Sequence, residues 1–129
     1  MFLLDTHIWI WWVDNPQNLT KKQISTIKKN EKSGLLLSRI SVWEVAKLVE
    51  KDRLQFTVPV EEWIELATRY PGVQLVNLTN EIVVNSTQLP GTFHKDPADQ
   101  LIVATSRVEK VCLLTADDKI KTYEHVDTC

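Results

Sequence analysis

The stretch from His94 to Ser106, HKDPADQLIVATS, holds two carboxylates three residues apart, directly before an apolar run. Aspartate is favoured at the N-cap of a helix, and proline is favoured at the first helical position. Asp96 fits such a cap, with Pro97 opening the helix and Asp99 at the third position, from which a side chain reaches back. Helix capping alone explains both acids, so the chemistry depends on what lies near them.

Three more acids follow apolar runs elsewhere in the chain, and each also has a structural explanation. Asp5 follows FLL and would cap a helix that begins near His7. Glu44 would close a capping box that begins at Ser41. Asp117 fits a turn or cap position. Taken singly, none of these acids requires a functional role.

The elements that would position these acids alternate along the chain. Four short apolar runs predict buried strands: Phe2 to Leu4, Leu35 to Leu37, Val73 to Val76 and Val111 to Leu114. Patterns typical of helices cover Thr20 to Lys32, Val42 to Lys51, Pro59 to Tyr70 and Pro97 to Val108. This alternation predicts an α/β fold, a three-layer α/β/α sandwich with a central, mainly parallel sheet, formed by residues 1–129 as a single domain. The sequence near Val126 is compatible with one further short strand.

Ligands of such sheets bind beyond the carboxyl ends of the strands. This rule predicts that Asp5, Glu44, Asp99 and Asp117 gather on one rim. Gathered carboxylates repel one another, and divalent cations remove that repulsion. Oxygen ligands without a nearby Cys or His pair suit Mg²⁺ or Mn²⁺, and two such ions can promote hydrolysis of a phosphodiester. The pattern therefore favours a metal-dependent nuclease.

The charge balance does not by itself suggest a nucleic-acid partner. The 129 residues carry a formal net charge of -2, so any attraction for RNA must come from local patches. Arg39, Lys47 and Lys95 lie beside the acidic motifs and are the expected RNA contacts. The RNA that is cut cannot be derived from these residues.

The N-terminal segment and the two cysteines indicate in which cellular compartment the protein is expected. The apolar start MFLLDTHIWIWWVD is interrupted by Asp5 and His7 and is too short to span a bilayer, so we expect mature protein and no membrane association. The number and spacing of Cys112 and Cys129 suggest neither a disulfide framework nor a zinc site. A reducing cytoplasm is the expected location.

Tryptophans crowd the first predicted helix. Trp9 and Trp12 share one face, whereas Trp11 points away from it, so the three cannot all enter one core. We expect at least one of them to be exposed and to mark a partner interface. Trp43 and Trp63 are expected in the core.

Four blocks, in this order, resemble the PIN-domain family, specifically the VapC-type toxins of toxin–antitoxin pairs: FLLDTHIWIWW, SVWEVAKLVEKDRL, HKDPADQLIVATS and LLTADDKI. The resemblance extends from Met1 to about Val126. It implies a ribonuclease that depends on Mg²⁺ or Mn²⁺, with the acidic ligands Asp5, Glu44, Asp99 and Asp117. It also implies that Thr6 and Thr115 support the site by hydrogen bonding and that Asp96 lies at its edge.

The same resemblance implies partners. A cognate antitoxin would lie against the first helices, and the toxin would form a homodimer. The chain departs from many members of the family at Gln100, where they carry Arg after the second aspartate of the DPAD block. We expect the loss of that fixed positive charge to affect binding of the substrate rather than the hydrolysis step.

Two alternatives remain. A phosphatase of the haloacid dehalogenase type would use Asp5 as nucleophile, but it needs a second acid where the chain has His7, and it gives no role to Glu44 or Asp99. A catalytically silent PIN-fold module that only binds a partner would keep the fold without the activity.

Overall fold

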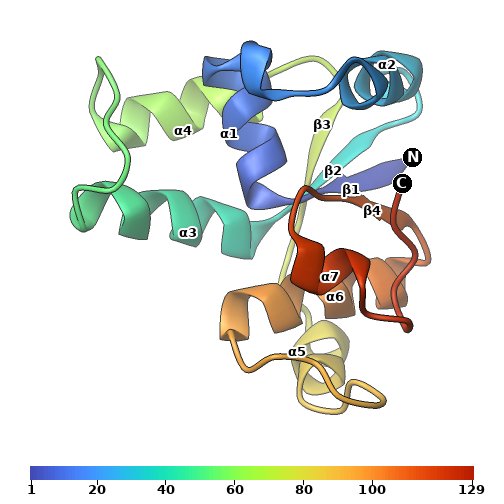
Figure 1. Cartoon of the computed structure of the whole chain (residues 1–129). Coiled ribbons are helices and arrows are strands. Elements are labelled where there is room, and N and C mark those ends of the chain that lie inside the picture. The colour runs from blue at the N-terminus through green and yellow to red at the C-terminus, as the bar shows by residue number, and fades with distance from the viewer.

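The computed structural model describes residues 1–129 and contains one parallel sheet with the strand order β3-β2-β1-β4 (Figure 1). The strands are β1 (Phe2–Leu4), β2 (Leu35–Ser38), β3 (Val73–Val76) and β4 (Cys112–Leu114). The register places Leu3 between Leu36 and Leu113. The predicted parallel α/β sheet is therefore confirmed. In place of a fifth strand, the structure has a single bridge between Leu113 and Thr128.

Helices connect and cover these strands (Figure 1). They are α1 (Thr6–Asp14), α2 (Lys21–Asn30), α3 (Arg39–Glu50), α4 (Val60–Thr68), α5 (Asn80–Ser86), α6 (Pro97–Glu109) and α7 (Asp118–Lys121), with a 3-10 turn at Pro16–Asn18. The predicted capping box of Thr20 and Gln23 is present at the start of α2. Helix α5 has no counterpart among the predicted helices.

Helix α3 begins three residues earlier than the sequence pattern predicts. Its N-cap is Ser38, whose hydroxyl accepts a hydrogen bond from the backbone N–H of Ile40. Ser41 instead lies inside the helix, with its side chain buried. The predicted capping box of Ser41 and Glu44 is therefore wrong, and capping does not explain the carboxylate of Glu44.

Alternating strand residues supply two cores. Phe2 and Leu4 of β1 pack with the side chains of α1, α2 and α4, whereas Leu3 packs on the opposite face with α6 and α7. Ile102 and Val103 of α6 are fully buried in this second core. Because the strands are covered on both faces, their carboxyl ends are the edge of the sheet that remains available for a site.

The tryptophans match the sequence-based expectations only in part. Trp9 is completely buried and meets Trp63 edge to face, with ring centroids 5.1 Å apart. Trp11 and Trp12 are partly buried and pack against the same core, so the expectation that at least one of the three tryptophans of α1 is exposed is wrong. Trp63 is buried as predicted, but Trp43 is 53% exposed, so its predicted core position is wrong. Trp9 cannot form part of a partner interface, because it has no accessible surface.

The C-terminal segment returns to the edge strand β4. Leu113 donates a backbone hydrogen bond to Asp127 and accepts one from Cys129. This pairing brings Cys129 to Cys112, and the two form a disulfide. The interpretation that the two cysteines suggest no disulfide is therefore wrong, because it considered their number and their spacing along the chain and not the return of the last residues to the sheet.

No helix of the protein has both the length and the apolar character that crossing a membrane requires.

Replacement of Cys129 by Ser should remove the disulfide and destabilise the oxidised protein. The bond closes a loop with a sequence separation of 17 residues. Cross-links of this size restrict the unfolded chain and contribute about 3 kcal/mol. Urea denaturation should show a loss of about this size without reductant. In dithiothreitol the wild type and the variant should unfold alike, and equal stabilities without reductant would contradict the assignment.

Candidate functional site

A pocket of about 310 Å³ opens at the carboxyl ends of β1 and β4. It is lined entirely by polar and charged side chains: Asp5, His7, Glu44, His94, Asp96, Asp99, Asp117 and Lys119. All four predicted acidic ligands, together with Asp96, thus share one pocket. We refer to it below as the acidic pocket.

Asp5 is the most deeply buried of these acids, with 6% of its surface exposed. It caps α1, because its Oδ1 accepts a hydrogen bond of 2.8 Å from the backbone N–H of Thr6. The hydroxyl of Thr115 donates to the other oxygen, Oδ2, at 2.6 Å. Burial raises the pKa of Asp5 even though both hydrogen bonds favour its charged form. Capping and a place in the pocket are therefore compatible at this residue.

Glu44 is held by hydroxyl groups. The hydroxyl of Thr6 donates to Oε1 of Glu44 at 2.5 Å, and the hydroxyl of Ser41 lies 2.8 Å from that of Thr6. Because the single hydroxyl proton of Thr6 goes to Glu44, Ser41 must donate to Thr6. Burial, with smaller contributions from the charges of Asp5 and Asp96, raises the pKa of Glu44 to about 7.

The two acids of the DPAD block have different environments. Asp96 caps α6 by accepting a hydrogen bond of 3.1 Å from the backbone N–H of Asp99. The carboxyl group of Asp99 takes no part in that cap. Its pKa is raised to about 7, first by burial and then by the charges of Asp96, Asp5, Glu44 and Asp117. Asp99 therefore experiences the accumulated negative charge of the pocket.

His94 lies beside Asp99, and the sequence analysis did not single it out. Its Nδ1 accepts a hydrogen bond of 3.4 Å from the backbone N–H of Asp96, so in the neutral ring the proton is on Nε2. Nε2 lies 3.1 Å from Oδ2 of Asp99, without the alignment of a hydrogen bond. Gln100 donates a hydrogen bond of 3.1 Å to the backbone carbonyl of His94. Gln100 thus helps to fix the loop that carries this imidazole.

Asp117 is linked to Asp5 through Thr115. The backbone N–H of Asp117 donates to the Thr115 hydroxyl oxygen at 3.0 Å, and that hydroxyl donates to Asp5. Asp117 also caps α7 by accepting from the backbone N–H of Lys119 at 2.8 Å. Thr115, which is buried, therefore fixes the relative positions of the two strand ends β1 and β4.

The acids line one pocket, but their carboxylates do not form a ready-made ligand set for a single metal ion. No three side chains among the His, Cys, Asp and Glu residues lie close enough to hold a metal ion as they stand.

The expected RNA contacts lie outside the acidic pocket. Arg39 is exposed at the start of α3 and donates to Oδ1 of Asn77 at 3.1 Å. Lys47 pairs with Glu50 at 2.8 Å, and Lys95 is exposed in the loop before α6. The lysine that does line the pocket is Lys119, which the sequence analysis did not select.

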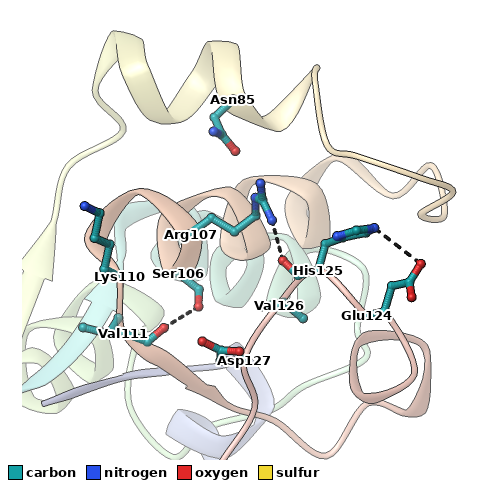
Figure 2. A pocket seen from close by; sticks show the side chains of 9 residues that line it. All are labelled: Asn85, Ser106, Arg107, Lys110, Val111, Glu124, His125, Val126 and Asp127. Carbon is teal, nitrogen blue, oxygen red and sulfur yellow. Dashed lines mark hydrogen bonds and ion pairs between the residues drawn. The ribbon is translucent and has the colours of Figure 1, made fainter.

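A larger pocket, of about 450 Å³, lies between α5, α6 and the C-terminal segment and shares no lining residue with the acidic pocket (Figure 2). The guanidinium of Arg107 donates to the backbone carbonyl of His125 at 2.6 Å (Figure 2). The hydroxyl of Ser106 donates to the backbone carbonyl of Val111, also at 2.6 Å. These side chains bind the protein's own backbone. The charged residues around them are of both signs, namely the positive Lys110 and the negative Glu124 and Asp127. Side chains of the larger pocket therefore hold the C-terminal segment in place, whereas the smaller pocket gathers five carboxylates.

Comparison with solved structures shows the same fold in toxin–antitoxin complexes. The chain superimposes on VapBC2 from Rickettsia felis bound to a promoter DNA fragment, with a TM-score of 0.75, 14% identity and coverage of 99% of this chain and 96% of that one. The DNA-bound VapBC from Salmonella typhimurium gives a TM-score of 0.72 at 16% identity, with coverage of 99% and 96%. At such low identities the likeness concerns the fold alone.

Sequence comparison gives a nearer relative and the family. The chain is 32% identical over 123 residues to Ribonuclease VapC22 from Mycobacterium tuberculosis (strain ATCC 25618 / H37Rv), which covers 95% of this chain and 92% of that protein. The model of the PIN domain matches residues 2–126. The resemblance of the four sequence blocks is thereby confirmed, and the chain belongs to the PIN domain family.

Proposed function

We propose that the protein is a metal-dependent endoribonuclease that acts as the toxin of a toxin–antitoxin pair. The observation that carries the proposal is the acidic pocket, in which five carboxylates gather at the edge of the sheet where α/β proteins bind ligands. The relative with 32% identity is named a ribonuclease, which supports RNA as the substrate. The family assignment removes the phosphatase of the haloacid dehalogenase type as an alternative.

The donors of the acidic pocket fit a hard divalent cation. Five of the eight lining side chains are carboxylates, two are the imidazoles of His7 and His94, and none is cysteine, so the carboxylate oxygens suit Mg²⁺ or Mn²⁺. Asp5, Glu44, Asp99 and Asp117 would hold the cation, whose positive charge would favour the ionised forms of Glu44 and Asp99, the two acids whose pKa burial and neighbouring negative charges raise to about 7. Bound Mg²⁺ supplies positive charge for a phosphate and makes water a better nucleophile.

The remaining residues of the site orient these donors. Thr115 fixes the carboxylate of Asp5, and Thr6 fixes that of Glu44, so each acid presents its other lone pairs to the pocket. Asp96 serves mainly as the cap of α6. Lys119 adds a positive charge at the rim, where an RNA phosphate would approach.

The proposed reaction is hydrolysis. A water oxygen attacks phosphorus, the bond from phosphorus to the 3′ oxygen breaks, and a proton passes to that oxygen. The products carry a 5′-phosphate and a 3′-hydroxyl. A cyclic phosphate among the products would instead show attack by the 2′-hydroxyl and would contradict the proposed site.

We further propose a cognate antitoxin and a homodimer as partners, and the cytoplasm as the location, where RNA substrates are found and where reducing conditions would open the disulfide between Cys112 and Cys129. Solved relatives with this fold are toxin–antitoxin complexes. Of the three tryptophans that the sequence analysis proposed as a partner interface, Trp9 is fully buried, so the proposed antitoxin contact is limited to the partly buried Trp11 and Trp12. For the homodimer, the exposed Val83 and Val84 of α5 are adjacent apolar side chains that a second copy could cover.

The substitution Asp99→Asn should abolish most of the RNA cleavage. Loss of a group that merely supports a metal ligand typically costs about 10–100-fold, so loss of the ligand itself should cost about 100-fold or more. The variant without metal should melt no lower than the wild type, because repulsion is relieved, and Mg²⁺ should stabilise it less. The matched control is Asp96→Asn, since Asn caps a helix about as well as Asp. Normal cleavage by the Asp99→Asn protein would contradict the assignment of Asp99 as a metal ligand. Undiminished cleavage by the wild type in EDTA would contradict the metal dependence.

The stability of the metal-free protein should fall as the pH rises from about 4 towards 7. In this range the unfolded chain loses protons that Glu44 and Asp99 retain in the folded state, because their folded pKa is about 7. Urea denaturation in EDTA from pH 4 to pH 8 measures the effect. The double variant Glu44→Gln and Asp99→Asn should show a smaller fall, and an equal fall in both proteins would refute this origin.

The substitution Trp11→Ala should weaken capture of the antitoxin. The indole of Trp11 lines a shallow pocket beside Asp5 and His7, so a partner there would contact it directly. Pull-down of the product of the neighbouring gene is the measurement, with circular dichroism to establish that the variant folds. Leu66→Ala, at an exposed side chain of α4, is the matched control. Undiminished capture by the Trp11 variant would exclude this contact.

A further inference from the structure

Trp43 is a large aromatic side chain on the outer face of α3, with 53% of its surface exposed. The helix buries Ser41 and Val45 on its opposite face, so the position of Trp43 follows from the helical period. Nothing in the fold or in the proposed catalytic role of the neighbouring acids accounts for an indole at this place.

Two cations flank this tryptophan along the helix. The spacing of Arg39, Trp43 and Lys47 is four residues at each step, which places them in one row on α3. Nζ of Lys47 lies 5.9 Å from the centre of the Trp43 ring, within the range of a cation–π contact. The other end of the row is the exposed guanidinium of Arg39. We call these three residues the α3 row.

The α3 row lies next to the acidic pocket. Glu44, the residue after Trp43, lines that pocket and is tied to Thr6 of α1. Helix α3 leaves the carboxyl edge of the sheet and extends away from the strands (Figure 1). The α3 row therefore lies on the outer face of the helix that also supplies Glu44 to the acidic pocket.

We propose that the α3 row binds a single-stranded segment of RNA, with a base stacked on Trp43 and phosphates of the neighbouring nucleotides on Arg39 and Lys47. This proposal rests on the proposed nuclease function and assigns a positioning role to residues outside the acidic pocket. It also predicts a preference for unpaired over duplex RNA, since paired bases do not present their faces.

The charges favour RNA over a protein as the occupant. The chain has a net charge of -2, and five acids face the approaching phosphate in the pocket, so attraction must come from a local row of cations. Arg39 has no acidic partner and bonds only the neutral amide of Asn77. Lys47 pairs with Glu50, but the side chains are 40% and 64% exposed, and such surface pairs readily yield to another anion.

The test is binding of fluorescein-labelled 12-mers of single-stranded RNA to the full chain in EDTA, which stops metal-dependent cleavage. Trp43→Ala should raise the Kd for oligouridylate about 5- to 150-fold, the range expected for one stacked base. Trp43→Phe should retain most of the affinity, because it keeps an aromatic face. Leu66→Ala, an equally exposed apolar side chain on α4, should bind as the wild type does.

A second ligand separates stacking from general damage. A 12-mer of the same charge that lacks bases should bind Trp43→Ala and the wild type equally. Lys47→Ala should weaken both ligands and should reduce the slope of log K against log salt by about 1. In Mg²⁺, Trp43→Ala should raise KM for cleavage more than it lowers kcat.

Three results would overturn the proposal: equal affinities of Trp43→Ala and wild type for oligouridylate, an equal loss with the ligand that lacks bases, or loss of antitoxin capture with unchanged RNA affinity. The last result would assign the α3 row to a protein contact. Failure of the nuclease function itself would be seen separately, as absence of cleavage by the wild type in Mg²⁺.

Discussion

The site depends on the burial of one carboxylate, that of Asp5, at the junction of β1 and α1. A buried acid is costly unless it is hydrogen-bonded, and Asp5 receives the N–H of Thr6 on one oxygen and the hydroxyl of Thr115 on the other. The first bond starts α1, and the second joins the end of β1 to the end of β4. The side chain of Thr6 in turn holds Glu44. Helix start, strand alignment and the positions of two further acids thus rest on hydrogen bonds around a single residue.

Capping and chemistry are not alternatives in this protein. Asp5, Asp96 and Asp117 each cap a helix, and each also lines the acidic pocket. Glu44 and Asp99 cap nothing, and they are the two acids whose pKa is raised to about 7. Helix capping therefore positions three of the acids, while burial and neighbouring negative charges raise the pKa of the two others. A cation bound at this place would favour their ionised forms.

The sequence predicted the strands and the acidic pocket because both follow from local patterns. Short apolar runs must be buried on two faces, and acids after such runs must meet at one edge. The pattern did not locate the start of α3, because Ser38 and Ser41 both resemble N-caps. Trp43 was misplaced since Val42, Val45 and Leu48 already supply the apolar residues that the inner side of α3 needs. The pairing of Cys112 with Cys129 depends on the backbone of a C-terminal segment without a hydrophobic pattern.

The order of the strands determines when the site can exist during synthesis. β1 lies inside the sheet between β2 and β4. The first strand to leave the ribosome therefore pairs on one side with the last strand to be synthesised. Thr115, which holds Asp5, follows it by 110 residues. Chains emerge from their N-terminus, and contacts between distant segments form only when both are present. A nascent chain that lacks β4 therefore has neither Asp117 nor a fixed Asp5, and the cell that translates it is not exposed to an assembled pocket until almost the whole protein has been made.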